Sequence, residues 1–584
     1  MIVIFLVFFA IYREHIRPSL AFLLAVLAFA LTGILNSKEV LAGFSNDSIA
    51  SIILLILITA GLRKNFNLEL LFDRAFKSVS SYRVFLFRMM SQVALLSSII
   101  NNTPVVALMT PYVFDWGRKH NIAPSRLLIP LSYATIMGGM ITLIGTSTTL
   151  VLNGFLIDYD QAQLNPYHLL FIGFSVTLFG ILFIAFIGYR LLPANVDTLA
   201  AFKKNRREYL IETELSPASK FIDQSVTAAG LRNLKGVYLV EIIRGNKVIS
   251  PVKPSETINK EDVMIFAGNT GDVMDLVKPG NGLTLPKDVL HEYNGKVDVV
   301  EAVISNNSSL IGKKVKETDF RNRYDAAIVA IHRNGEKLRG KIGEVRLSPG
   351  DLLLIYAGSD FFQRADLYRD IYVVNKVREI NSPEKKKVYA LVITLITAII
   401  LMITGQLSLF ASLLIIFSIL VGFKMISVQD IKREIDLNLI AILVFSLAIG
   451  QAIIKTNAAN LIAAGFIDIL FPYGVVILLI GLLLFTTLLT SFVTNIGAIS
   501  ITFPLAYSIS QNLGIEGMPF YLAITYAASA AFLTPIGYQT NLIIFGPGGY
   551  KFKDFFRIGL PVTILYLTVA TICILLLYPE VFNN

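Results

Sequence analysis

The feature that most constrains this chain is a series of long apolar runs without charged residues. A bilayer's hydrocarbon core is about 30 Å thick, so a helix needs about 20 predominantly apolar residues to cross it. Hydrophobic residues make up 54% of the 584 residues and charged residues only 16%, more apolar side chains than a soluble surface can hide. The runs predict a polytopic α-helical membrane protein and cover residues 19–35, 48–62, 127–157, 169–189, 388–404, 407–423, 437–454, 518–550 and 558–578.

Three further runs depart from this pattern. Residues 89–114 and 471–510 carry helix breakers near their middles. The opening run 1–11 is short and no small-residue cleavage site follows it, which favours a truncated span over a signal peptide. The single cysteine, Cys573, cannot form an intrachain disulfide, and the five histidines lack paired metal-ligand spacing, so neither a disulfide scaffold nor a zinc site is expected.

A soluble insert, residues 200–380, separates two apolar blocks. Its alternating residue patterns predict strands at 237–243, 263–267, 327–331 and 352–356. Residue pairs such as Glu212/Glu301, Arg232/Arg321 and Asp262/Asp351 recur at an offset of 89, which predicts two copies of one small α+β module. We therefore expect four domains: a first membrane repeat at 1–199, tandem modules at 200–288 and 289–380, and a second membrane repeat at 381–584.

Basic residues are distributed very unevenly if the insert is cytoplasmic. If the spans are counted outward from the insert, the basic residues that flank them fall on the cytoplasmic side. Only Lys38 and Lys455 fall on the outer side of the membrane. This bias is what membrane insertion requires, and it explains the net charge of +10 without a nucleic-acid partner. The same count predicts two re-entrant helical hairpins of opposite orientation, at 82–115 and 471–510.

The two apolar blocks also resemble each other. Asn101-Asn102-Thr103 followed by Pro111 aligns with Thr494-Asn495-Ile496 followed by Pro504 at an offset of 393. The nine residues 142–150 align with 534–542 at an offset of 392, and five of them are identical. Opposite orientation with internal similarity predicts an inverted-repeat secondary transporter with broken spans at 127–157 and 518–550, where substrate and ions bind.

Polar residues at the hairpin tips and breaks are the candidate ligands. A helix interrupted in hydrocarbon leaves backbone groups that need polar partners. Carbonyls and amides there suit cations, whereas hydroxyls and helix N-termini suit an oxyanion. Such residues often only pack between helices, but their duplication in opposed hairpins favours a binding role. The set comprises Asn101, Asn102, Thr103, Thr494 and Asn495 at the tips, and Gly145-Thr146-Ser147 and Gly537-Tyr538-Gln539 in the breaks.

None of the long runs contains an Asp, Glu, Lys, Arg or His. Proton-driven transporters usually carry such a group at membrane depth, so neutral-oxygen coordination of sodium is favoured over a carboxylate proton relay. A bound dianion would take its countercharge from co-bound cations and helix dipoles.

At these residues the chain resembles the divalent anion/sodium symporter family of the ion transporter superfamily. That family carries Ser-Asn-Thr at each tip and a Gly-Thr-Pro-Pro-Asn-like break. Here both tip Asn residues are kept, but Ser is replaced at both tips, Thr at one tip, and the prolines are absent from the breaks. The resemblance implies a dimeric elevator-type transporter, with Na+ as the coupling ion at Asn102, Gly145, Asn495 and Gly537 and the anion held at the tips. The departures make sulfate at least as suitable a substrate as a dicarboxylate.

The tandem modules resemble the C-terminal regulator-of-potassium-conductance domain (RCK-C, TrkA-C-like). The resemblance rests on 305–312, 325–331 and Pro349-Gly350-Asp351 with the apolar residues that follow. It implies a dimerising or ligand-binding regulator, with a cyclic dinucleotide as a candidate ligand. A Gly-x-Gly-x-x-Gly loop after a strand does not occur in the insert, so no NAD or ATP site of the Rossmann type is expected, and no other organic cofactor. Residues 335–342 nearly match a phosphate-binding loop but are interpreted as a β-hairpin.

The sequence therefore predicts a sodium-coupled symporter of a small divalent anion, sulfate or dicarboxylate, and not an enzyme. Its predicted setting is the lipid of the cell (inner) membrane, as a multi-pass homodimer. A sodium/proton antiporter or metalloid-oxyanion exporter of the same superfamily is the alternative. A potassium channel gated by the modules is a remote one, because no filter string such as Thr-Val-Gly-Tyr-Gly occurs.

Overall fold

The computed structural model describes most of both apolar blocks and much of the insert. The short run 1–11, the basic residues 385–387 and most of the run 388–404 lie outside the described residues. The residues that the structure describes are 18–65, 79, 81–195, 210–216, 219–231, 234, 237–245, 247–249, 251–268, 282–284, 298–305, 308–334, 336–338, 342–358, 360–368, 370–373, 393–394, 397, 401, 406–435, 437–492 and 494–582.

The first block forms helices where the apolar runs predict them. Residues 140–146 divide the run 127–157 into two helices. The elements are α2 (Pro18–Leu31), α3 (Ser37–Leu41), η1 (Ala42–Ser45), α4 (Asp47–Asn65), α6 (Tyr82–Ser97), α7 (Asn102–Lys119), α8 (Ser125–Gly139), α9 (Ser147–Asp158), α10 (Pro166–Phe186) and η2 (Gly188–Arg190).

The second block follows the same plan. Here residues 530–538 interrupt the run 518–550. The elements are α16 (Leu409–Gly422), α17 (Val428–Glu434), α18 (Leu437–Lys455), α19 (Ala458–Leu470), η6 (Phe471–Tyr473), α20 (Val475–Phe492), α21 (Asn495–Leu513), α22 (Met518–Ser529), α23 (Gln539–Phe545), α24 (Phe552–Leu577) and α25 (Pro579–Phe582).

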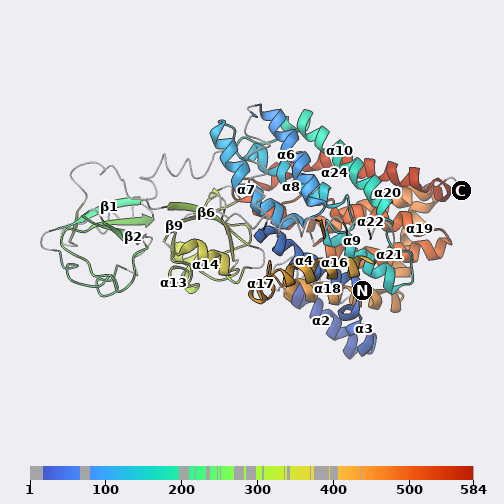
Figure 1. Ribbon diagram of the computed structural model, residues 1–584, viewed down its shortest axis with the longest axis horizontal. Coiled ribbons are helices and arrows are strands. Elements are labelled where there is room, and N and C mark those ends of the chain that lie inside the picture. Colours follow the sequence, from blue (N-terminus) through green and yellow to red (C-terminus); the bar gives the residue numbers. More distant parts are fainter. Residues whose placement is uncertain are drawn as a thin grey trace.

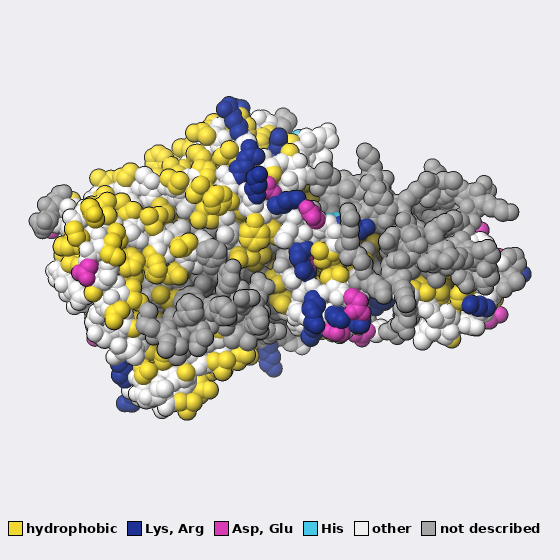
Figure 2. Space-filling model, turned by 180° about the vertical axis from the view of Figure 1, so that it is seen from behind, with side chains coloured by type: hydrophobic (Ala, Val, Ile, Leu, Met, Phe, Trp, Pro, Cys, Tyr) yellow, Lys and Arg dark blue, Asp and Glu magenta, His cyan; other side chains and the backbone are white. Residues whose placement is uncertain are grey.

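Within the described residues, four helical segments are long and apolar enough to cross a bilayer. Large apolar side chains on the outside of the helical body, such as Phe174 and Leu484, are more than half exposed. Figure 2 shows hydrophobic side chains spread over this body, while Lys and Arg side chains gather where it meets the insert. An exposed surface of this kind fits a protein whose helices face lipid. The four segments are Ser37–Leu62, Pro166–Phe186, Leu437–Lys455 and Phe552–Leu577.

The two blocks share one apolar core. Helix α10 packs against α24, and α7 packs against α23. Buried polar groups join the blocks where they meet: the Tyr133 hydroxyl donates to the Phe532 carbonyl (2.6 Å) and the Ser132 hydroxyl to the Asn541 amide oxygen (2.7 Å). Because buried hydroxyls need partners, these bonds fix how the blocks fit together.

The insert forms two five-stranded antiparallel sheets, one after the other along the chain. The first module, within 210–284, contains β1 (Leu210–Leu215), β2 (Val237–Arg244), β3 (Lys247–Ile249), β4 (Val263–Gly268) and β5 (Leu283–Thr284). The second module, within 298–373, contains β6 (Asp298–Ile304), β7 (Ala326–Arg333), β8 (Glu336–Lys337), β9 (Leu352–Ala357) and β10 (Ile371–Val373), with α13 (Phe320–Tyr324), α14 (Phe361–Tyr368) and the short turns η4 (Val315–Glu317) and η5 (Ile342–Glu344).

The two sheets have the same topology. Their strand orders are β3-β2-β4-β1-β5 and, read in the same sense, β8-β7-β9-β6-β10. Each has a register shift at the same place, between Leu239 and Glu241 and between Ile328 and Ala330. In Figure 1 the second module adjoins the helical body and the first module lies farther out. The predicted strands at 237–243, 263–267, 327–331 and 352–356 are all present.

Candidate substrate site

The first candidate tip lies at the start of α7. Asn101 is the N-cap residue and Asn102 the first residue of the helix. The Asn102 side chain is fully buried and accepts a hydrogen bond from the Ser97 hydroxyl, which also bonds the Thr135 carbonyl (2.9 Å). Helix α7 is thereby tied to the end of α6 and to the middle of α8.

The second tip repeats this arrangement at the start of α21. The Thr490 hydroxyl bonds the Asn495 amide oxygen (2.9 Å) and the Ala528 carbonyl (2.6 Å). The offset of 393 residues relates all three pairs: Ser97 to Thr490, Asn102 to Asn495, and Thr135 to Ala528. Thr494 is the N-cap residue, and its hydroxyl accepts from the Gly497 N–H (3.2 Å).

The breaks in the two spans are also built alike. In the first break the Thr142 hydroxyl donates to the Ser98 carbonyl and accepts from the Gly145 N–H (3.1 Å). In the second, Thr534 donates to the Ser491 carbonyl (2.8 Å) and accepts from the Gly537 N–H (3.2 Å). One threonine thus anchors each break to the C-terminal end of the preceding helix, α6 in the first half and α20 in the second, and the backbone groups of the interruption gain partners.

Neutral oxygen atoms converge around the first break. A Cβ at Gly145 would press against the carbonyl oxygens of Gly139 and Ser97, and one at Gly139 against the Asn102 amide oxygen. Only glycine allows so close an approach. In the second half the Thr490 carbonyl oxygen lies 3.1 Å from the corresponding Cβ position of Gly537. Clusters of carbonyl and amide oxygens at unwound helix ends are the kind of site that coordinates Na+ in transporters.

The first tip meets the second break directly. The Asn102 amide donates to the Tyr538 hydroxyl (2.7 Å), and the Thr103 hydroxyl donates to the Gln539 amide oxygen (3.1 Å). Tyr538 is the N-cap of α23 and Gln539 its first residue. The Thr146 side chain also approaches the Tyr538 hydroxyl. Most of the predicted site residues therefore lie in one region, although the paired residues are 436 positions apart.

A pocket opens beside the first tip and first break. Asn101, Thr146 and Ser147 line one part of it, together with Ile144 and Leu150. The pocket is small and partly open to solvent. Thr146 is the N-cap of α9, so the pocket receives the N-terminal ends of both α7 and α9. Helix N-termini attract anions because their N–H groups are unpaired and their dipoles end there.

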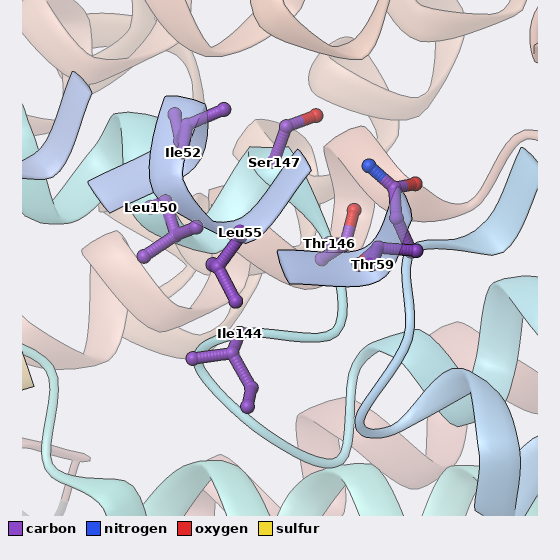
Figure 3. Close-up of a pocket in the computed structure, with 8 residues that line it drawn as sticks. Ile52, Leu55, Thr59, Ile144, Thr146, Ser147 and Leu150 are labelled. Atoms are coloured by element: carbon purple, nitrogen blue, oxygen red, sulfur yellow. The ribbon is translucent and has the colours of Figure 1, made fainter. Parts of the chain in front are cut away.

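The rest of the pocket wall comes from α4, a helix over the predicted run 48–62 whose residues were not predicted to line the site. Ile52, Leu55 and Thr59 face the pocket at helical spacing. Figure 3 shows these α4 side chains together with Ile144, Thr146, Ser147 and Leu150 around the pocket. Thr59 is buried and carries the one hydroxyl of the apolar stretch 52–62. Its spacing from Ile52 and Leu55 is the one signal in the sequence that could have identified it.

The second tip is not joined to the first break in the same way. No hydrogen bond among the described residues links Thr494 or Asn495 to Thr146 or Ser147. Thr494 is exposed, and the Nδ2 atom of the buried Asn495 has no hydrogen-bond partner in the described part of the chain. The described residues also hold no group of three His, Cys, Asp or Glu side chains that would suit a transition metal.

This arrangement of broken helices within a shared apolar core is that of a membrane transporter. A family model for citrate transporters matches residues 4–414 and 399–584. The chain therefore belongs to the citrate transporter family, and it is a transporter and not an enzyme. The family match supports the resemblance to anion/sodium symporters as far as the transporter family is concerned.

Curated relatives agree with this assignment. The chain is 30% identical over 566 residues to a putative sulfur deprivation response regulator of Chlamydomonas reinhardtii, covering 94% of this chain and 96% of the relative. It is 28% identical over 587 residues to an uncharacterized transporter of Escherichia coli, covering 97% of this chain and 96% of the relative. It is 29% identical over 377 residues to sodium/sulfate cotransporter 1 of Chlamydomonas reinhardtii, covering 60% of this chain and 42% of the relative.

Proposed function

We propose that the chain is a sodium-coupled symporter of a small divalent anion, with sulfate as the first candidate and a dicarboxylate as the second. The observation that carries the proposal is the duplicated set of neutral hydrogen-bonding groups around Asn102 and Asn495. The name of the sodium/sulfate cotransporter relative supports both the ion and the anion.

Sodium is favoured by the chemistry of the oxygens at the tips and breaks. The Ser97, Gly139 and Thr490 carbonyls and the Asn102 and Asn495 amides can replace the water around a small hard cation. None of these groups changes its charge with pH, so they offer no proton to exchange. A sodium ion bound there also supplies positive charge next to the pocket.

An oxyanion is favoured by the donors that line the pocket. Asn101, Thr146, Ser147 and Thr59 offer an amide and three hydroxyls, and no charged side chain is among the lining residues. A tetrahedral dianion can accept several such bonds at once. Its charge would be balanced by the helix N-termini and by co-bound sodium.

The pocket's position supports an elevator mechanism. Its polar residues come from the α7 and α9 ends, whereas α4, which packs against α16, supplies Ile52 and Leu55 as an apolar wall. We propose that the α6–α9 and α20–α23 elements move as a transport unit along such a wall, within a homodimer in the cell membrane. The insert is proposed to be cytoplasmic and to consist of two RCK-C-like regulatory modules that bind a ligand such as a cyclic dinucleotide.

The test is uptake of labelled anion into proteoliposomes that contain the purified chain. Sulfate and succinate are compared at equal concentration with an inward sodium gradient, and each is used to compete with the other. We expect sodium-dependent sulfate uptake that excess succinate reduces weakly. Uptake of neither anion, with intact protein in the membrane, would reject the proposed substrate class.

A further inference from the structure

The second module contacts the end of α7 that lies opposite the candidate site. The Arg118 guanidinium, in the last turn of α7, pairs with the Glu301 carboxylate of β6 at 3.3 Å. The Glu301 side chain is fully buried. The Arg118 guanidinium carbon lies 4.3 Å from the centroid of the Phe114 ring, and this contact holds the guanidinium in place. Because the Glu301 carboxylate is fully buried and the Arg118 guanidinium partly so, this ion pair favours one docked geometry.

The same module contacts the far end of α23. A Cβ at Gly350 would lie 3.2 Å from the Leu542 side chain, and one at Gly546 would lie 2.9 Å from both the Gly350 carbonyl oxygen and the Leu352 Cβ. Gly350 has a φ of +79°, which glycine adopts without strain. Leu352 and Val303 belong to the apolar core of the helical body. This is packing of the kind found within one domain.

Both contacted helices begin at the candidate site. Helix α7 starts with Asn102 and Thr103, and α23 starts with Gln539 directly after Tyr538. Their starts are joined by the two hydrogen bonds described above, and their other ends are both held by the second module. With 18 residues, α7 spans about 27 Å at 1.5 Å per residue. A tilt of either helix at the module therefore moves its start at the site.

The first module is connected to this contact through Arg321. The Arg321 guanidinium, in α13 of the second module, donates to the carbonyls of Leu239 (2.6 Å) and Val252 (3.1 Å) in the first module. The described residues thus provide a continuous route from the first module, through the second, to the two helices.

We propose that the second module is a clamp on the transport unit: it sets the spacing of α7 and α23 and thereby the geometry of the Asn102–Tyr538 and Thr103–Gln539 pairs. Arg118 is a positioning residue in this scheme and does not touch the substrate. The proposal rests on the proposed function only in taking these pairs as part of the substrate site. We therefore expect that undocking the second module changes the geometry of the site even when none of the site's own residues is substituted.

The test uses two readouts that do not need a known substrate. Docking is measured by a short bis-maleimide that links Glu336→Cys to Lys551→Cys, whose native side chains pair at 2.8 Å across the contact. Site geometry is measured by the maleimide labelling rate of Thr59→Cys in a separate chain. Cys573→Ser is the background in both, and the full chain is kept in membranes.

Arg118→Gln is the undocking variant, and Lys119→Gln is its matched control because Lys119 pairs with Asp115 of its own helix (2.7 Å). We expect Arg118→Gln to lower the cross-linked fraction and to change the Thr59→Cys labelling rate, each about fivefold or more, whereas the control changes neither. Glu301→Gln, which keeps the buried shape, should act like Arg118→Gln, and size-exclusion profiles verify folding. Undiminished cross-linking, or lost cross-linking with an unchanged labelling rate, overturns the proposal. A failure of sulfate or sodium transport would leave these readouts unaffected.

Discussion

At the scale of single residues, the Asn102 and Asn495 amides are the groups on which sodium binding should depend most. Replacing either by alanine removes an amide oxygen from the candidate ion site together with the hydrogen bond that Ser97 or Thr490 donates to it, and each hydroxyl keeps only its carbonyl partner. Such a loss typically costs about 1–3 kcal/mol, so we expect the apparent sodium affinity to fall about tenfold in Asn102→Ala and in Asn495→Ala. Sodium titration of anion uptake in proteoliposomes measures this.

The matched control is Asn153→Ala. Asn153 is a buried amide of α9 whose oxygen accepts from the Leu164 N–H (3.1 Å), away from the site. Wild-type sodium dependence in both tip variants would show that the tip amides only pack the helices together.

Thr59 provides a separate test of the pocket. Thr59→Val keeps the shape of the side chain but removes its hydroxyl, and one neutral hydrogen bond contributes about 0.5–1.5 kcal/mol. We expect the KM for the anion to rise about threefold to tenfold, with the sodium dependence unchanged. Thr571→Val is the control, because its hydroxyl bonds the Leu567 carbonyl of its own helix (2.8 Å). Equal KM values in the two variants would exclude Thr59 from the anion site.

The sequence identified residue types at the site but not their pairing. Duplication pointed to Asn102, Asn495 and the glycines of the breaks. The Asn102–Tyr538 pair depends on how α7 and α23 pack, which no local pattern encodes. Thr59 was missed because one hydroxyl in an apolar helix ordinarily bonds its own backbone and faces a neighbouring helix.

At the scale of elements, hydrophobicity predicted the helices well and their ends less well. Helix α24 begins at Phe552, before the apolar run 558–578, because the Asp554 carboxylate in its first turn accepts a hydrogen bond from the Lys551 N–H (2.8 Å). Strand β6 was not predicted because its alternation is interrupted by Glu301. That carboxylate is buried against Arg118 of a membrane helix, a contact far outside its own module.

Strand β7 carries a titratable group with a clear pH signature. Burial lowers the pKa of His332 from 6.5 to about 4, so the folded module holds this imidazole neutral. As the pH falls from 6.5 toward 4, the unfolded chain takes up a proton that the folded one does not, and the second module loses up to about 3 kcal/mol of stability. His332→Gln should flatten this dependence. Hydrogen exchange of β7 and β9 amides, corrected for intrinsic rates, measures it; equal slopes in both proteins would contradict the assignment.

At the scale of the whole molecule, the two modules should differ in how much the transporter needs them. Replacing residues 205–290 by a flexible linker leaves the Arg118–Glu301 pair and the Gly350–Leu542 contact intact, so uptake should stay within about twofold of wild type. Replacing 205–380 uncovers Leu542 and Phe545 and leaves Arg118 without Glu301, and uptake should fall about tenfold or more. Equal uptake by the two deletion proteins, at equal amounts in the membrane, would show that the second module is dispensable.

We propose that sodium, bound by neutral oxygens in both halves, drives anion transport. The most direct measurement is the simultaneous flux of labelled sodium and labelled sulfate into proteoliposomes, with and without a proton gradient. We expect sulfate to enter only together with sodium, more than one sodium ion to accompany each anion because the ion-site chemistry is duplicated, and a proton gradient alone to drive no uptake. Undiminished sulfate uptake in sodium-free buffer, driven by the proton gradient, would contradict it.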